Sequence, residues 1–286
     1  MRAPLPTARR IVAVTAQLLV QWLAAHLLAP NVSSETRRRL AQGLAVRTVR
    51  ACGVRISSRG TVPGGGEPLL VVANHVSWLD VYAINAALAA RFVAKAETAR
   101  WPVAGRITRA FDAIFLRRDH FRDAARVVTA VARALARGER VVVFPEGTTT
   151  DGTRLRRFYA AMFEAASATG SRVLPVAVRY RDASGRPSRS AAFIDDDTFG
   201  GSLLRVLREP ALTAEVRWGT PIETAGRSRR ELAALAHTAI AGALDLPSWA
   251  VERQSGPLSR ARYPGRAGPA APARSRRFQL AWRVGA

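Results

Sequence analysis

From about residue 54 onward, short apolar runs alternate with longer segments that carry a helical periodicity. This alternation is typical of βα units, in which buried strands lie side by side and helices cover the sheet. We therefore expect an α/β fold with a mostly parallel central sheet flanked by helices. The runs that fit strands are 54–57, 69–73, 91–94, 113–116, 140–144, 173–180, 191–194 and 214–218.

Two of the intervening segments have clear helix boundaries. Segment 121–137 places Val127, Val131 and Leu135 on one face, and Gly138 follows as a natural stop. A second helix is expected to begin at Ser228, where Ser-Arg-Arg-Glu matches a capping box. Both helices fall inside the α/β domain, which we expect to span residues 54–250.

The N-terminal segment, residues 1–53, departs from this pattern. Crossing a bilayer takes about 20 mostly apolar residues, and 11–29 nearly qualify, but they include Gln17 and Gln21. Arginines flank both ends, so the positive-inside rule assigns no orientation. We expect membrane-associating helices, the first lying in or dipping into one leaflet and the second, from about 35 to 51, basic. A helix buried in the protein's own core is the alternative.

The composition narrows the possible partners. The formal net charge is +23, and every basic residue except Lys95 is an arginine. Such a surface attracts nucleic acid, a phospholipid surface, or phosphorylated and acidic substrates. Residues 251–286, rich in Pro, Gly and Arg, are expected to form a disordered basic tail. A single cysteine, Cys52, excludes a disulfide framework, and we expect a reducing compartment and no metal site.

His75 and Asp80 lie in "NHVSWLD", directly after the apolar run 69–73. Ligands collect at the carboxyl ends of strands in open α/β sheets. In one continuous helix the two side chains would point about 140° apart, so His75 must precede the helix to meet Asp80. A capping box of Ser77 and Asp80 would start the helix there and let the carboxylate orient a general base. The alternative is structural: Asp80 caps its helix and His75 binds a loop carbonyl.

A second strand end carries a similar arrangement. In "VVVFPEGTTTDG", residues 141–152, an apolar run stops at Pro145 and is followed by Glu146, a glycine and several hydroxyl groups. These polar groups could bind an acceptor molecule. A tight polar turn with a solvated glutamate is the alternative.

Four segments together resemble the glycerophospholipid acyltransferase family, whose members acylate lysophosphatidic acid and related lysolipids. "NHVSWLD" resembles the family's N-H-x4-D block and "FPEGT" its F-P-E-G-T block. "DAIFLRR", residues 112–118, resembles G-x-I-F-I-x-R, and "VLPVAV", residues 173–178, resembles its proline-containing strand. The blocks follow the family's order, which is hard to obtain by chance.

The resemblance implies a mechanism without a protein nucleophile, and the sequence holds no G-x-S-x-G elbow. His75 would be the general base on the acceptor hydroxyl and Asp80 would orient it, while the hydroxyl oxygen attacks an acyl thioester. No cofactor is implied, since acyl-CoA or acyl carrier protein would be a co-substrate. The acceptor pocket would be formed by Arg118, Glu146, Gly147 and Thr148.

The sequence departs from the family pattern in two places. Asp112 stands where the second block commonly has glycine. Many lysophosphatidic acid enzymes continue "FPEGT" with arginine and serine, whereas this chain has Thr149 and Thr150. We expect lysophosphatidic acid as acceptor, giving phosphatidic acid, with lyso-ornithine lipid or another lysolipid as the alternative. The downstream arginines that could replace the missing one are Arg154, Arg156 and Arg157.

The resemblance also implies partners and a location. A lysolipid acceptor comes from a bilayer, so we expect attachment to the phospholipid surface at the cytoplasmic face of the inner cell membrane. A basic module that binds nucleic acid or membrane is a rival from another class. It predicts exposed aromatics interleaved with basic residues, which are not found, so we expect no nucleic-acid partner. A hydrolase that activates water with the same histidine is a closer rival.

Overall fold

The computed structural model of the protein describes residues 7–248, apart from 65, 102–103, 117–120 and 195. In this part of the chain, seven strands form one sheet in the order β1-β7-β6-β2-β5-β3-β4. All neighbouring pairs are parallel except β6 and β7. The expected α/β fold with a mostly parallel sheet is therefore confirmed. The strands are β1 Val54–Arg59, β2 Leu69–Ala73, β3 Arg91–Lys95, β4 Ile114–Leu116, β5 Arg140–Val143, β6 Arg172–Arg181 and β7 Leu212–Trp218.

The strand predicted at 191–194 is wrong. The backbone N–H of Ala192 closes a turn onto the carbonyl of Arg189, and the N–H of Phe193 donates to the carbonyl of Val76. Ala191 and Ala192 are buried although they lie in a loop, and two N–H groups of the run bond to a turn and to the loop after β2 instead of to a strand. Apolar character alone did not distinguish a strand from a packed loop.

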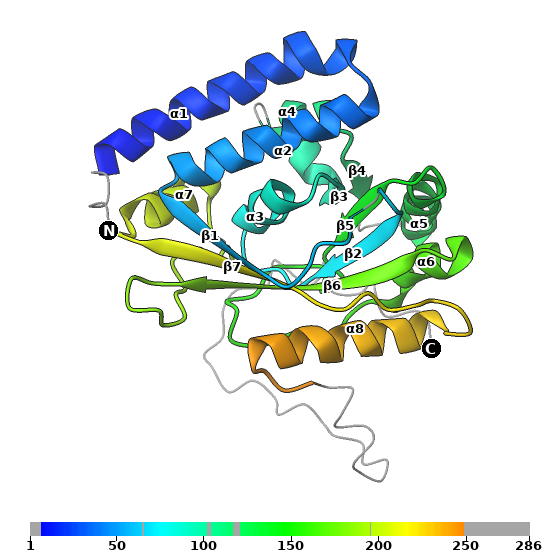
Figure 1. Ribbon diagram of the computed structural model, residues 1–286. Helices are drawn as coiled ribbons and strands as arrows, with labels where there is room; N and C mark the ends of the chain where they lie inside the picture. The colour runs from blue at the N-terminus through cyan, green and yellow to red at the C-terminus, as the bar shows by residue number, and fades with distance from the viewer. Residues whose placement is uncertain (1–6, 65, 102–103, 117–120, 195, 249–286) are drawn as a thin grey trace, which may run out of the picture.

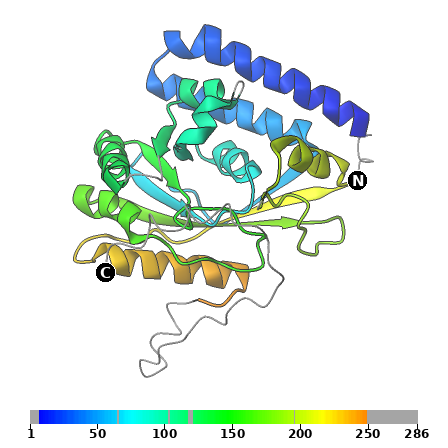
Figure 2. The ribbon, with the colours of Figure 1, turned by 180° about the vertical axis from the view of Figure 1, so that it is seen from behind.

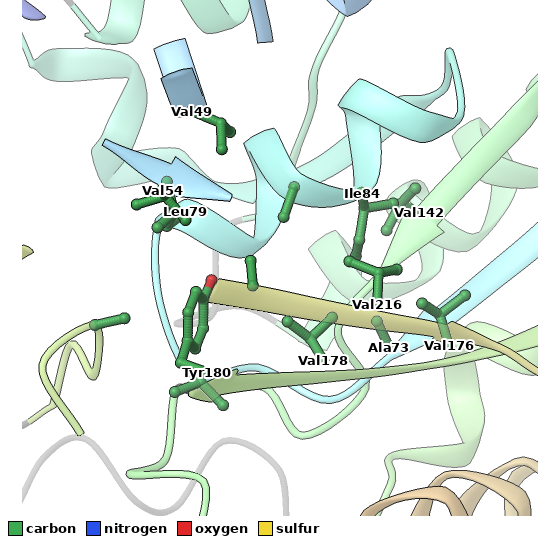
Figure 3. Close-up of a cluster of buried hydrophobic side chains, with 14 of the residues drawn as sticks. Val49, Val54, Ala73, Leu79, Ile84, Val142, Val176, Val178, Tyr180 and Val216 are labelled. Atoms are coloured by element: carbon green, nitrogen blue, oxygen red, sulfur yellow. The ribbon is translucent and has the colours of Figure 1, made fainter. Parts of the chain in front are cut away.

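Helices cover both faces of the sheet (Figures 1 and 2). On one face, β2 contributes Leu69, Val71 and Ala73 to a core shared with α2, α3 and α7 (Figure 3). On the other, Leu70 and Val72 join a core formed with α5, α6 and α8. Burial on both faces explains why β2 is apolar throughout instead of alternating. The helices are α2 Ser34–Ala51, α3 Leu79–Ala87, α4 Ala104–Ala110, α5 Phe121–Ala136, α6 Glu164–Thr169, α7 Phe199–Arg208 and α8 Arg229–Leu244.

The predicted helix boundaries are confirmed. Helix α5 ends just before Gly138, whose φ of 78° suits a residue without a side chain. Helix α8 begins with both halves of the capping box between Ser228 and Glu231. Short 3-10 turns at Ala96–Arg100 and Ala160–Phe163 complete the description of this part of the chain.

The N-terminal segment forms two antiparallel helices on the α3 side of the sheet (Figures 1 and 2). Helix α1, Thr7–Leu23, continues through a π-helical turn, Ala24–Leu28, and a 3-10 turn, Ala29–Asn31, before α2 begins. The stretch Thr7–Asn31 is long and apolar enough to cross a membrane by length and composition. The expected tail, 251–286, lies outside the described residues.

Helix α1 has a polar side facing the protein and an apolar side facing outward. Arg10 is buried and donates to the carbonyls of Leu207, Glu209 and Pro210, at the end of α7. Gln17 and Gln21 are also buried, against α2. The exposed large apolar side chains of this segment are Ile11, Val12, Leu19, Val20, Leu23, Leu27 and Leu28.

Candidate active site

His75 and Asp80 meet at the carboxyl end of β2. The imidazole Nδ1 of His75 lies 2.8 Å from Oδ2 of Asp80. The same oxygen accepts hydrogen bonds from the backbone N–H groups of Val76, at 2.7 Å, and Ser77, at 2.9 Å. A carboxylate that accepts from its neighbours leaves Nδ1 as the donor, so the proton-accepting nitrogen of the ring is Nε2.

The start of α3 explains how the pair meets. His75 precedes the helix, as predicted, so its ring can turn back toward Asp80 in the first turn. The predicted cap is displaced by one residue, because the helix begins at Leu79 and Trp78 occupies the cap position without a side-chain bond. Half of the capping box is present: Ser77 N–H donates to Asp80, but the Ser77 hydroxyl accepts from Leu79 instead.

Asp80 is fully buried and its second oxygen contacts a distant strand. Oδ1 accepts a 2.6 Å hydrogen bond from the hydroxyl of Tyr180, on β6. With four donors around it, the carboxylate is compensated for the loss of water. Sequence reasoning missed Tyr180. It lay inside the predicted strand 173–180, but nothing in the sequence showed that its side chain would reach "NHVSWLD".

The imidazole of His75 is held on its face as well as at its edge. It stacks on Phe144, the first residue of "FPEGT", with ring centroids 3.9 Å apart and planes 14° from parallel. Its side chain is 19% exposed, whereas that of Asp80 is 0% exposed. The dyad therefore has a buried carboxylate end and an accessible imidazole end.

Glu146, in the loop after β5, binds the backbone of the loop after β2. Its Oε1 accepts from the backbone N–H of His75 at 2.8 Å, and Oε2 accepts from that of Arg156 at 2.9 Å. Burial raises the pKa of Glu146 to about 7, although these two N–H donors oppose the shift. Both carboxylate oxygens thus bind backbone groups of the protein, and the predicted contact of Glu146 with an acceptor stays a prediction.

The rest of the "FPEGT" loop folds over the backbone of His75. Gly147 has a φ of 72°, and a Cβ there would lie 3.0 Å from the Tyr159 ring, so a side chain would be strained and crowded. The N–H of Thr150 donates to the carbonyl of His75 at 2.8 Å. Thr148 lies between them and is half-buried. Arg118, the remaining predicted pocket residue, lies outside the described residues.

The two departures from the family pattern have structural explanations. Asp112 has a φ of 59°, which glycine adopts freely and aspartate tolerates better than most residues. Its carboxylate pairs with Arg37 at 2.7 Å. The hydroxyl of Thr149, which stands in place of the arginine after "FPEGT", donates to the carbonyl of Phe193. Of the candidate replacements, Arg154, Arg156 and Arg157 all have exposed side chains.

The described residues contain no group of three or more His, Cys, Asp or Glu side chains placed to hold a metal ion. The acid and base groups at the end of β2 and β5 instead bind one another and the backbone. The His75 side chain remains partly exposed, and its Nε2 is the ring nitrogen that can accept a proton from a bound molecule.

Comparisons with known proteins agree with the motifs and the fold. A family model described as Acyltransferase matches residues 48–179. A lyso-ornithine lipid O-acyltransferase from Pseudomonas aeruginosa is 34% identical over 227 residues, which are 79% of this chain and 86% of that protein. A 1-acyl-sn-glycerol-3-phosphate acyltransferase from Neisseria meningitidis is 35% identical over 161 residues, 56% of this chain and 63% of that protein.

The fold is shared with a solved structure. The crystal structure of the 1-acyl-sn-glycerophosphate acyltransferase from Thermotoga maritima superimposes with a TM-score of 0.62 at 20% identity. The match covers 88% of this chain and 96% of that one. Because the Pseudomonas relative is 34% identical over 79% of this chain and 86% of its own length, the protein belongs to the acyltransferase family and is an acyltransferase.

Proposed function

We propose that the protein transfers a fatty acyl group from an acyl thioester to the free hydroxyl of a lysolipid, with His75 as general base. The observation that carries this proposal is the 2.8 Å contact between Nδ1 of His75 and the buried carboxylate of Asp80. That contact fixes the tautomer of the His75 ring, so that Nε2 is the nitrogen that accepts the proton. It also stabilises the imidazolium that forms during the reaction.

The chemistry needs no protein group to become covalently bound. Nε2 takes the proton of the acceptor hydroxyl while the oxygen attacks the thioester carbonyl. The new C–O bond forms and the C–S bond breaks. The imidazolium then returns its proton to the departing thiolate, so that the enzyme ends in its starting state.

Two acceptors compete, and different observations favour each. Lysophosphatidic acid is favoured by the motif resemblance and by the Neisseria relative. Lyso-ornithine lipid is favoured by Thr149 in place of an arginine, since a bidentate phosphate partner is missing there. It is also favoured by the Pseudomonas relative and by a Rhizobium meliloti relative of the same name, 38% identical over 169 residues.

Membrane attachment belongs to the same proposal. The outward side of α1 and of the π-helical turn after it carries seven exposed large apolar side chains, while Arg10 bonds to the end of α7 and Gln21 bonds to α2. Burying such a face in a leaflet is favourable, and the basic surface adds attraction to anionic lipids. We place the protein on the cytoplasmic face of the inner membrane, where acyl-CoA and acyl carrier protein are available as donors.

The test is acyl transfer by the purified full-length protein in mixed micelles. Lysophosphatidic acid and lyso-ornithine lipid are offered separately, each with acyl-CoA and with acyl carrier protein as donor. We expect diacylated product from at least one pair and a loss of at least about 1,000-fold in kcat for His75→Ala. Full activity of that variant would remove the proposed base, and release of free fatty acid without lipid product would indicate a hydrolase.

A further inference from the structure

Tyr180 reaches the buried carboxylate of the His75–Asp80 pair from a strand that is distant in sequence. It lies near the end of β6, and Figure 3 shows its ring rising from that strand toward α3, with the oxygen at the tip. The hydroxyl is 2.6 Å from Oδ1 of Asp80, and both side chains are buried, at 2% and 0% exposure. One hundred residues of sequence separate them.

The two oxygens of Asp80 divide their partners unequally. Oδ2 accepts from the His75 ring and from the N–H groups of Val76 and Ser77. Among the described residues, Oδ1 is bonded by Tyr180. Rotation of the carboxylate would break the bond to Tyr180 as well as the bond to His75, so the hydroxyl holds the plane in which the ring is bound.

The hydroxyl of Tyr180 stays protonated and therefore remains a hydrogen-bond donor to Asp80. Burial, the charge of Asp80 and the hydrogen bond between them raise the pKa of Tyr180 well above its ordinary range, although a hydrogen bond involving Ser77 opposes the shift. The phenol therefore keeps its proton at every pH at which an enzyme is assayed. A short bond from a neutral donor withdraws part of the negative charge of the carboxylate.

Core packing alone does not account for a tyrosine here. The surrounding cluster is apolar, with Val178, Leu79 and Val54 among its members, and a phenylalanine ring would fill the same volume. A hydroxyl gains stability in such a place only by finding a partner. The partner that it finds is the carboxylate bound to His75.

We infer that Tyr180 is a positioning residue of the reaction, which fixes the orientation of Asp80 and withdraws part of the negative charge that this carboxylate presents to His75. This inference rests on the proposed function, because it assigns Tyr180 a role through the dyad. It adds a third member, from β6, to a unit that otherwise lies within six residues of the chain.

The sign of the effect follows from charge. Without the Tyr180 hydroxyl, Asp80 keeps more negative charge on its oxygens and stabilises the protonated His75 ring. The base then becomes neutral only at higher pH, so the acid limb of kcat/KM moves upward. Asp80 binds the ring directly, and Tyr180 binds the other oxygen of that carboxylate. Glu146 binds its backbone and has a pKa of about 7, and Cys52, near Tyr180, has a pKa raised to about 12 by burial.

The first experiment compares Tyr180→Phe with Tyr82→Phe in the full-length protein. Tyr82 is a second tyrosine whose hydroxyl bonds away from the dyad, to Gln21 at 3.4 Å, so it is a matched control. For Tyr180→Phe we expect kcat to fall about tenfold, KM to stay within about twofold, and the acid limb to rise by about half a pH unit or more. Glu146 is shared by both variants, so its titration cancels in the comparison. Equal acid limbs in the two variants would overturn the inference.

A second variant tests the same effect while the tyrosine ring stays in place. Placing 3-fluorotyrosine at position 180 alone leaves the ring in place and makes the phenol a stronger donor. The acid limb should then move downward, opposite to the shift of Tyr180→Phe. A shift in the same direction as Tyr180→Phe, or none, would mean that the hydroxyl does not act through charge on Asp80.

Double variants separate this inference from the proposed function. If Tyr180 acts through the carboxylate, adding Tyr180→Phe to Asp80→Asn should cost less than about twofold in kcat. A further tenfold loss would assign Tyr180 a role independent of Asp80 and overturn the inference. Activity in His75→Ala would instead overturn the proposed function itself, whatever Tyr180→Phe shows.

Discussion

The site at the ends of β2 and β5 and the helix α1 bury polar groups in opposite ways. At the site, Asp80 and Glu146 are buried and hydrogen-bonded, and the His75 side chain is partly exposed. In α1, Arg10 and Gln21 are turned toward the protein, and apolar side chains face outward. In both regions buried polar side chains are hydrogen-bonded, although Nε of Arg10 has no partner, and along α1 large apolar side chains are exposed.

This difference indicates that the two regions have different surroundings. A helix in water exposes its polar side, because apolar area costs about 25 cal/mol per Å² when it is hydrated. We propose that the outer side of α1 meets the hydrocarbon of a membrane, where this reversed arrangement is stable. At the site, in contrast, the carboxylates are buried and the His75 side chain is partly exposed, which suits the proposed transfer of a proton away from bulk water.

The largest of the expected effects concerns the pH dependence of stability and should come from the buried carboxyl group of Glu146. Burial raises its pKa from 4.5 to about 7. Between these values the folded protein holds a proton that the unfolded chain has lost, so the free energy of unfolding falls as pH rises. The shift corresponds to about 3 kcal/mol. In Glu146→Gln this part of the pH dependence should be absent.

This pH dependence of the unfolding free energy is measured by urea unfolding at about pH 4.5 and about pH 8. The difference in unfolding free energy between wild type and Glu146→Gln should change by about 3 kcal/mol across this range. Glu164→Gln, at an exposed glutamate on α6, serves as the control and should follow wild type. Parallel curves for wild type and Glu146→Gln would mean that the carboxyl is not buried in the folded protein.

The outer side of α1 should give an intermediate effect, and on membrane binding only. Val12 is 69% exposed and Leu27 is 63% exposed. Changing both to glutamine should weaken binding to anionic phospholipid vesicles by about tenfold to a hundredfold, because each side chain loses apolar area in the leaflet. Tm should stay unchanged. Sedimentation with vesicles is the measurement, and Ala8→Gln, at an exposed position of the same helix, is the control.

The inner side of α1 should give the smallest effect, and on stability only. Gln21 donates to the Thr48 hydroxyl at 2.8 Å and accepts from the Tyr82 hydroxyl at 3.4 Å. Gln21→Leu leaves the Tyr82 hydroxyl buried without its acceptor and should lower the free energy of unfolding by about 1 kcal/mol. Thermal unfolding measures this. Weaker vesicle binding with unchanged Tm would contradict the assignment of the two sides.

Much of this organisation could be predicted from the sequence. The strands other than 191–194, the helix ends at Gly138 and Ser228, and the fold class followed from periodicity and capping residues, which are local signals. The meeting of His75 and Asp80 was also predictable, because five residues at a strand-to-helix junction leave few arrangements. The four motif blocks identified the family before the fold was known.

The supporting contacts around the dyad could not be predicted. Tyr180 reaches Asp80 from β6, and Glu146 binds the backbone N–H of His75 from the loop after β5. Sequence patterns give the type of each element and its buried side, but not which residue of one strand lies opposite a residue of another loop. The same limit applies to the run 191–194, where contact with Val76 replaced strand pairing.

The sequence by itself determined the α/β class, the positions of the two strand-end motifs and the amphipathic N-terminus. These depend on short-range order: strand periodicity, caps and the spacing of His75 from Asp80. The tertiary structure decided which groups support the base, how Glu146 comes to have a pKa of about 7, and which side of α1 faces outward. These depend on burial and on contacts between distant segments, which exist only once the sheet has assembled.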